Sequence, residues 1–261
     1  MKSSEGKPFI YEKPQLIEVI CQLRYPVILS IDTKEPADFQ DEIRAKFPRY
    51  SCQTEKLPLA DGKQQSIRNH NFISEDGVYK LSMTKQFIAL STMRYSGWEH
   101  FARTLDEALW QFIRVYRPAY FERVGLRYIN GISRRLLGLE DRRWNDLLQP
   151  QYLSILDDDA VDEQRVTKCS VDIERRLDGK AGLKLHAGPG MVQRTVRTPE
   201  GVRNLKEPDS RFILDQDLYV AEKTQLSEVT ETLEALHEHA DRIFTDAITD
   251  TLHDAMEPRE L

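Results

Sequence analysis

Residues 14–27 read PQLIEVICQLRYPV, and this stretch sets the expected fold. Its β-branched and aliphatic residues lie between two prolines, which predicts a strand over residues 16–27. Residues 118–128 read PAYFERVGLRY and repeat the order of proline, glutamate and Leu-Arg-Tyr, with spacing that differs by one residue. The repetition predicts that the chain holds two copies of one α+β unit. Chance similarity between two short strands is the alternative.

The rest of the chain alternates strand patterns with two long helical patterns. Residues 96–116 and 227–256 each carry one apolar stripe at helical spacing. A capping box of Ser96 and Glu99 is expected to start the first of these helices. Shorter helices are predicted at 36–47 and 144–148, and further strands at 71–74, 79–84, 87–93, 119–132, 166–177, 180–187 and 211–220. The pattern indicates an α+β fold in which antiparallel sheets pack against long helices.

The expected boundary between the two halves lies near Pro118. Residues 1–118 form the first α+β half and residues 119–261 the second, and together they are expected to form one compact unit. Turn-forming residues concentrate between 188 and 210, which predicts a long loop there. They are Gly188, Pro189, Gly190, Pro199, Gly201 and Pro208. A loop of that length inside a compact domain is uncommon and is often functional.

Composition narrows the class of protein. The chain has 261 residues, 40% of them hydrophobic, and a formal net charge of −6, which argues against a surface that wraps nucleic acid. Cys21, Cys52 and Cys169 are far apart and form no C-x-x-C pair, which argues against a disulfide framework or a cysteine zinc site. The sequence shows no signal-peptide pattern and no run of about 18 apolar residues. We therefore expect a cytoplasmic protein that does not enter a membrane.

The segment 165–206 is basic. It holds ten cations and four acids, whereas the predicted C-terminal helix is acidic. The cations are Arg165, Lys168, Arg175, Arg176, Lys180, Lys184, Arg194, Arg197, Arg203 and Lys206. Such a segment can bind nucleic acid, grip an acidic partner or pair with the acidic helix. Aromatic residues, which stack on single-stranded bases, are missing from it.

Asp215 and Asp217 are candidate metal ligands. They lie two residues apart on a predicted strand and therefore point to the same face. Two carboxylates on one face can bind a divalent cation, as in metal-dependent nucleases and phosphodiesterases. The alternative is that they form ion pairs with Arg24, Arg127 or another arginine, or that they face water. Beyond this metal, the sequence indicates no cofactor.

Arg24-Tyr25 and Arg127-Tyr128 are candidate binding pairs. Each arginine is expected near the end of a strand, where it can hold a carboxylate or phosphate, while the tyrosine adds a stacking face. The alternative is an internal ion pair that orders the two halves.

The repeated motifs also carry a family resemblance. They are P-x-L-I-E-V-x-x-x-L-R-Y-P at 14–26, R-V-G-L-R-Y-I-N at 123–130 and I-L-D-x-D-x-Y at 213–219. Together they resemble an uncharacterised, sporadically distributed bacterial family of about this length. A patchy distribution implies mobile loci such as phage-defence or toxin–antitoxin operons, and it implies no particular chemistry.

Taken together, these features favour a non-enzymatic protein-interaction or regulatory component. Its expected partner is another protein, and self-association is plausible because a long helical stripe could pack on a second copy. The alternatives are a metal-dependent nuclease that uses Asp215 and Asp217, and a nucleic-acid-binding module that uses residues 165–206. The candidate partner-binding residues are Arg24, Tyr25, Arg127, Tyr128, Arg175, Arg176, Arg194, Arg197 and Arg203.

Overall fold

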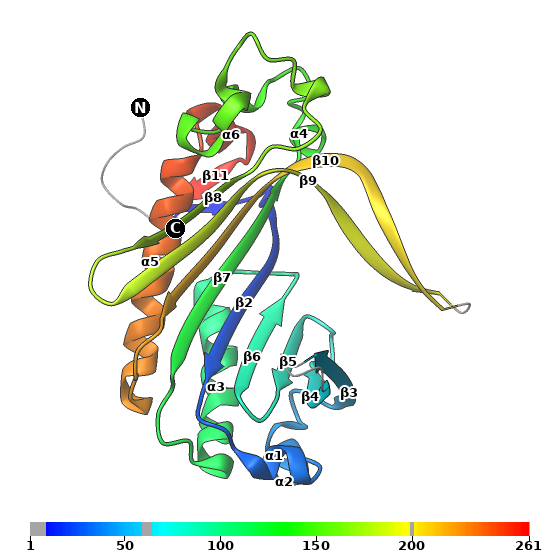
Figure 1. Ribbon diagram of the computed structural model, residues 1–261, viewed down its shortest axis with the longest axis vertical. Coiled ribbons are helices and arrows are strands. Elements are labelled where there is room, and N and C mark those ends of the chain that lie inside the picture. Colours follow the sequence, from blue (N-terminus) through cyan, green and yellow to red (C-terminus); the bar gives the residue numbers. More distant parts are fainter. Residues whose placement is uncertain (1–8, 59–63, 199–200, 261) are drawn as a thin grey trace.

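The central element is a nine-stranded sheet in which every neighbouring pair is antiparallel (Figure 1). The computed structural model describes residues 9–58, 64–198 and 201–260, without the side chains of 9, 55–58, 64–65, 192–198, 201–208 and 260. In sheet order the strands are β3 (Arg49–Pro58), β4 (Gln64–Ile73), β5 (Tyr79–Met83), β6 (Phe87–Thr92), β2 (Leu16–Arg24), β7 (Arg123–Ile132), β10 (Gly201–Val220), β9 (Ala181–Thr198) and β8 (Val171–Arg176). A separate pair, β1 (Phe9–Tyr11) and β11 (Pro258–Glu260), joins the two ends of the chain. The predicted α+β class is confirmed.

Helices lie along one face of this sheet, which we call the helical face (Figure 1). The two long ones are α3 (Trp98–Tyr116) and α5 (Val229–Ala247). The short α-helices are α1 (Leu29–Thr33), α2 (Ala37–Ile43), α4 (Arg134–Leu137) and α6 (Asp250–Ala255). Five 3-10 helices complete the description at Trp144–Asp146, Pro150–Tyr152, Ser154–Asp157, Glu163–Arg165 and Leu226–Glu228. Within the described residues, no helix is long and apolar enough to cross a membrane.

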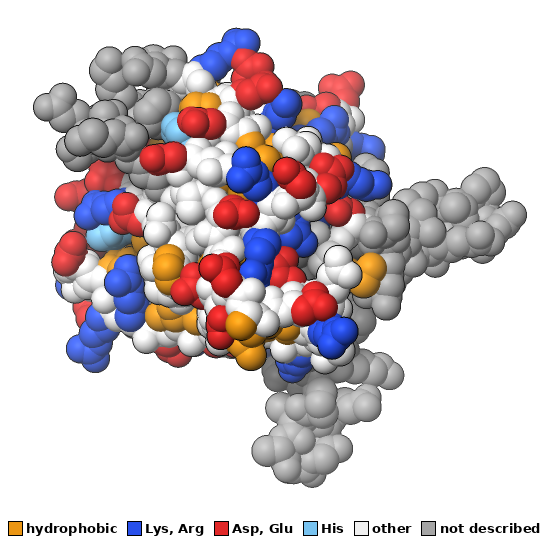
Figure 2. All heavy atoms as spheres, turned by 90° about the horizontal axis from the view of Figure 1, so that it is seen from above, with side chains coloured by type: hydrophobic (Ala, Val, Ile, Leu, Met, Phe, Trp, Pro, Cys, Tyr) orange, Lys and Arg blue, Asp and Glu red, His pale blue; other side chains and the backbone are white. Residues whose placement is uncertain are grey.

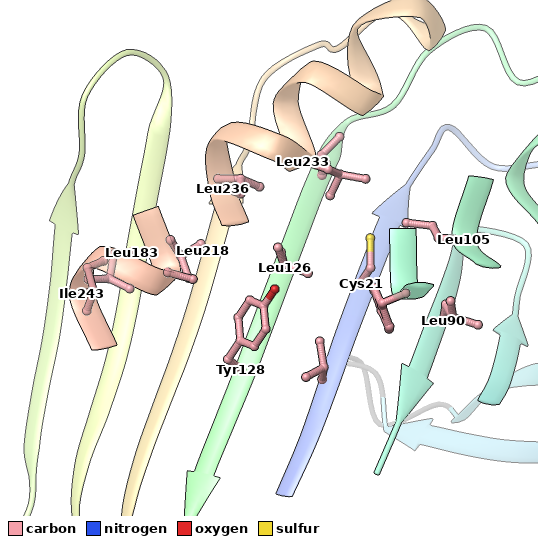
Figure 3. Close-up of a cluster of buried hydrophobic side chains, with 14 of the residues drawn as sticks. Cys21, Leu90, Leu105, Leu126, Tyr128, Leu183, Leu218, Leu233, Leu236 and Ile243 are labelled. Carbon is pink, nitrogen blue, oxygen red and sulfur yellow. The ribbon is translucent and has the colours of Figure 1, made fainter. Parts of the chain in front are cut away.

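The core forms where the strands meet α3 and α5. In β2, Val19, Cys21 and Leu23 are fully buried, while the residues between them are only partly buried, as period-two alternation requires. Figure 3 shows Cys21 near Leu105 of α3. Apolar side chains of β7, β9 and β10 lie along α5 in the same view. All six residues of the predicted α5 stripe are buried: Val229, Leu233, Leu236, Ala240, Ile243 and Ala247.

The start of α3 differs from the prediction. The residue before the helix is Gly97 with φ of 126°, no side chain caps the helix, and Ser96 lies one position too early to act as the cap. A φ of this value favours glycine, so the backbone turn at Gly97 sets the first helical residue at Trp98. The predicted capping box of Ser96 and Glu99 is therefore absent, although the predicted helix and its buried apolar stripe are present.

The C-terminal helix is broken, whereas the sequence pattern predicted one continuous helix over 227–256. α5 ends at Ala247, and Ile248 is extended with φ of −96° and ψ of 153°. The backbone around Ile248 pairs with residues 147–149: the N–H of Gln149 donates to Ala247 O at 2.9 Å, and that of Thr249 donates to Leu147 O at 2.9 Å. Competition from this distant segment ends the helix, and the side chain of Thr249 then caps α6.

The predicted loop at 188–210 was also wrong. β9 continues to Thr198 and β10 begins at Gly201, so the two strands form a long ribbon that extends away from the helices (Figure 1). Pro189 is tolerated because β8 pairs with β9 only as far as Ala187, so its missing N–H costs no bond to β8. Gly188 marks close approach to another backbone, since a Cβ at this position would lie 2.4 Å from Cys169 O.

That contact predicts the effect of Gly188→Ala. The added methyl carbon would meet the Cys169 carbonyl and would lie 3.0 Å from Ser170 Cα, and both are backbone atoms that cannot rotate away. We expect the strain to lower the free energy of unfolding by about 1–3 kcal/mol, measured by urea denaturation. Gly190→Ala on the same strand is the matched control, because its added Cβ would meet only the side chain of Ile213, at 3.0 Å, and we expect a smaller effect. An unchanged Gly188→Ala stability contradicts this packing.

The strands of the first half run from the centre of the sheet to one edge, and those of the second half run to the other edge. β2 and β7 lie side by side at its centre, where Cys21 is paired with Leu126 and Leu23 with Val124. The later strands of the first half continue from β2, and those of the second half continue from β7. In each half a long helix follows the last strand of this sheet, α3 in the first and α5 in the second, and α6 and β11 come after α5. Common origin of the halves and a domain boundary at residue 118 stay predictions.

Candidate functional site

The sheet face opposite α3 and α5 carries rows of charged side chains, and we call it the charged face. It is defined by residues of four neighbouring strands: Arg123 and Arg127 of β7, Asp215 and Asp217 of β10, Lys184 and His186 of β9, and Asp172 and Glu174 of β8. They alternate with residues such as Leu126, Leu218 and Leu185 that are buried on the helical face. The predicted pairing of Asp215 and Asp217 on one side of a strand is therefore present.

Both aspartates are held by arginines of β7. Asp215 accepts from Arg127 Nε at 2.7 Å and from Nη2 at 2.5 Å, and Asp217 accepts from Arg123 Nη2 at 2.7 and 2.9 Å. The hydrogen bonds that Arg127 donates to Asp215 raise the pKa of Arg127 above its ordinary value. This is the internal ion-pair alternative, and it fixes β10 against β7 through charge-assisted bonds.

Two glycines let this network pack tightly. Tyr219 of β10 is directly opposite Gly125 on one neighbour and Gly182 on the other. A Cβ on Gly182 would lie 2.7 Å from the Tyr219 ring, and one on Gly125 would lie 2.1 Å from Arg123 Nη1. With these positions clear, the Arg123 guanidinium lies 5.0 Å from the centre of the Tyr219 ring. The sequence analysis did not single out Gly182, and it named Tyr219 only as the last residue of the motif at 213–219.

The network continues to the outer strands. Glu174 accepts from the Tyr219 hydroxyl at 3.2 Å and pairs with Lys184 at 3.5 Å, and His186 Nδ1 lies 2.7 Å from Asp172. A shallow cleft of about 410 Å³ lies over these side chains. Among the described residues, no group of three histidine, cysteine or acidic side chains could hold a metal ion. The matched charges favour a hydrated, self-paired surface, and the metal-dependent hypothesis gains no support from this geometry.

The predicted Arg-Tyr binding pairs are separated by the sheet. Tyr25 is 1% exposed and donates to Thr84 O at 2.7 Å, and Tyr128 is 6% exposed with its hydroxyl 2.9 Å from His237 Nδ1. Consecutive strand residues point to opposite faces, so neither tyrosine can stack on a ligand held by Arg24 or Arg127. The expected stacking face was wrong, and both tyrosines are core residues.

The structure describes only some of the basic side chains of segment 165–206. Arg175 and Arg176 are exposed on β8, while the side chains of Arg194, Arg197 and Arg203 lie outside the described residues. At the end of the molecule seen in Figure 2, described basic and acidic side chains are interspersed. Neither sign dominates that view, which gives no indication of a basic surface there.

A second hollow, which the sequence analysis missed, lies between α2 and α3. Its volume is about 600 Å³, and we call it the helix groove. Ile43, Phe47 and Ala108 form its buried apolar floor, and Trp110 stands at its border with 59% of its surface exposed. A signal was present in the sequence, because Trp110 is a large apolar residue that does not belong to the buried stripe of α3.

Ion pairs order the border of the helix groove. Arg114 pairs with Glu42, and its guanidinium carbon lies 5.0 Å from the centre of the Trp110 ring. Opposite, Lys46 Nζ lies 2.8 Å from Glu107 Oε2 and 3.2 Å from Thr104 Oγ1. These contacts restrain the Trp110 ring and the charged side chains at the border.

One polar atom lies inside the lining. Gln111 Oε1 is buried and has no hydrogen-bond partner among the described residues. A buried acceptor left unpaired costs about 1–3 kcal/mol.

Comparison with known proteins gave no relative: no protein-family model matches the chain, and no curated protein matches it. The resemblance to the bacterial family stays a prediction.

Proposed function

We propose that the protein is a protein-recognition module whose helix groove receives an apolar side chain of a partner protein. The observation that carries the proposal is Trp110, which is 59% exposed beside a groove of about 600 Å³ with a buried apolar floor. Exposed tryptophans beside apolar pockets are the residues that most often dominate protein–protein binding energy. An apolar anchor placed on Ile43 and Phe47 would cover the tryptophan face that solvent now contacts.

The polar groups of the groove support a protein rather than a small ligand. Small-molecule sites bring several accessible polar groups together, whereas the floor of this groove is apolar and Gln111 Oε1, unpaired among the described residues, is itself buried. Around the anchor, the pairs Arg114–Glu42 and Lys46–Glu107 form the polar border typical of interfaces.

Pre-organisation adds to the case. Trp110 loses little side-chain freedom on binding because Arg114 already lies over its ring and is itself held by Glu42. Ordering a free side chain at an interface costs about 0.5–1.5 kcal/mol, so a fixed anchor site binds more tightly for the same contact.

The other hypotheses have less support. The nuclease hypothesis needs free carboxylates, but Asp215 and Asp217 are both engaged by arginines. Nucleic-acid binding would rest on the β9–β10 ribbon, whose outer side chains are not described. We propose a cytoplasmic setting, and a defence or toxin–antitoxin role rests on the family resemblance alone.

Site-specific photocrosslinking in the native host tests this function. A p-benzoylphenylalanine in place of Ala45, an exposed residue of the groove border, should give one discrete crosslinked protein. The same group in place of Leu136, which is 57% exposed on α4, is the matched control and should give none. Trp110→Ala should remove the Ala45 crosslink without changing the melting temperature, since Trp110 is a surface residue. A product that persists in Trp110→Ala contradicts the proposal.

A further inference from the structure

The two edges of the nine-stranded sheet differ in how they are protected. At one edge, four of the six residues of β8 are charged: Asp172, Glu174, Arg175 and Arg176. Charges on an edge strand discourage pairing with another chain. At the other edge, the charged residues of β3 are Arg49, Glu55 and Lys56, and the stretch between them, residues 50–54, reads YSCQT and carries no formal charge.

The unprotected stretch of β3 is accessible. Tyr50 is 38% exposed, and Ser51 to Thr54 are also exposed. β3 pairs with β4 along its whole length, and in the sheet order of the described residues it has no second neighbour. Its outer backbone N–H and C=O groups therefore offer a template for one more antiparallel strand.

A second copy of β3 can fill that position with matching faces. Tyr50 points to the helical face, where its ring lies 5.2 Å from that of Phe72, and Cys52 shares this face two residues along. When two copies pair antiparallel about a two-fold axis at Cys52, Tyr50 meets Thr54 and Ser51 meets Gln53 of the second copy. Each pair joins residues of the same face, so the helices of both copies stay on one side of a continuous sheet.

Charge selects this register. Centring the axis on Cys52 places Arg49 opposite Glu55 of the second copy, and symmetry repeats the pair. Centring it on Ser51 or Gln53 also matches faces, but it places Arg49 opposite Gln53 or Leu57. Arg49 is already positioned, because its Nη2 donates to the carbonyls of Ser74 at 2.5 Å and Glu75 at 3.0 Å. Its remaining N–H groups can still donate to a carboxylate.

We infer that the protein forms a two-fold dimer through antiparallel pairing of β3 with β3 of a second copy, centred on Cys52. The interface is isologous, so it closes after two copies and leaves β8 as the charged outer edge of the joined sheet. The paired residues 49–55 do not belong to the lining of the helix groove.

Cysteine crosslinking tests the register in the unmodified chain. Cys52 is exposed and Cys21 is buried, and the two-fold pairing brings the Cys52 thiols of both copies together. Diamide, which oxidises two thiols to one disulfide, should convert the wild-type protein to a covalent dimer linked through Cys52. Cys52→Ser should abolish that product, and Cys169→Ser should retain it. A dimer linked through Cys169, or no covalent dimer, overturns the inference.

Charge reversal tests the energetics without oxidation. Light scattering should show that the wild type dimerises, and that Arg49→Glu and Glu55→Arg each weaken dimerisation about tenfold, because like charges then face each other twice. Arg49→Gln, which loses the same turn contacts without reversing charge, is the control and should weaken it less. The double variant should recover the wild-type dissociation constant. A monomeric wild type, or a dimer whose dissociation constant is the same in the charge-reversed variants, overturns the inference.

Discussion

Replacing Phe112 by alanine is expected to lower the free energy of unfolding by about 3–5 kcal/mol. Phe112 is completely buried on α3, with its ring centre 4.9 Å from that of Tyr25, 6.2 Å from Phe39 and 5.3 Å from Tyr116. It therefore joins α3 to α2 and to the end of β2. The lost ring would leave a cavity that three different elements cannot all move to fill.

Urea denaturation followed by circular dichroism measures this effect through the transition midpoint. Trp110→Ala is the matched control, since Trp110 lies two residues earlier on the same helix but is largely exposed, and its expected effect is within about 0.5 kcal/mol. Equal effects of the two substitutions would contradict the placement of the core between α3 and the sheet.

Acidification from about pH 6.5 to about pH 4 is expected to destabilise the protein through His237, by up to about 3 kcal/mol. The side chain of His237 is 16% exposed, stacks on Trp98 at 4.5 Å and has Nδ1 2.9 Å from the Tyr128 hydroxyl. Burial lowers the pKa of His237 to about 4. Between that value and the unfolded value near 6.5, the unfolded chain binds more protons, so stability falls as pH falls.

Asp241 opposes this trend weakly. Its Oδ2 lies 3.4 Å from His237 Nε2, and partial desolvation of the carboxyl group raises the pKa of Asp241 to about 6. The folded chain then holds a proton on Asp241 that the unfolded chain releases, so this group gains stability as pH falls through the same window. Because the Asp241 side chain remains 65% exposed, solvent screens its contribution, and we expect His237 to dominate.

Thermal melts of wild type and His237→Gln across this pH range measure the contribution. Glutamine cannot titrate, so the variant should lose most of the acid-dependent fall in melting temperature. Identical pH profiles for the two proteins would contradict a neutral, buried His237. Any fall in melting temperature that the wild type and His237→Gln share is due to other titrating groups.

Local patterns in the sequence predicted much of the sheet and its core. The strand predicted at 79–84 is present as β5, and its alternating residues Tyr79, Leu81 and Met83 are buried. The sequence Asp76-Gly77, which is typical of hairpin turns, precedes it, and Gly77 has φ of 71°. The stripes of α3 and α5 were likewise readable, because burial against a sheet imposes helical spacing.

Elements that depend on distant partners were not predictable in this way. The break at Ile248 follows from backbone pairing with residues 147–149, about a hundred positions earlier. Thr249 is a local signal for the start of α6, but it does not by itself explain why α5 ends. The β9–β10 ribbon was mistaken for a loop because Gly188 and Pro189 usually break strands. Here Gly188 fits because the backbone of Cys169 approaches too closely for a Cβ. Pro189 fits because the pairing of β9 with β8 ends at Ala187.

The candidate sites show the same limit. Period two correctly placed Asp215 and Asp217 on one face, but the identity of their partners depends on the register between β7 and β10. Arg127 is directly opposite Asp217 and yet bonds Asp215, which sequence could not reveal. Trp110 could be recognised as lying off the stripe, whereas the groove beside it needs α2, which packs there through tertiary contacts.

The most direct test of the proposed function is the binding constant of the crosslinked partner, measured by titration calorimetry against wild type, Trp110→Ala and Leu136→Ala. A tryptophan that anchors an interface contributes about 2 kcal/mol or more, so Trp110→Ala should bind roughly thirtyfold more weakly. Leu136→Ala should bind as wild type does. Equal affinity for wild type and Trp110→Ala would contradict recognition through the helix groove.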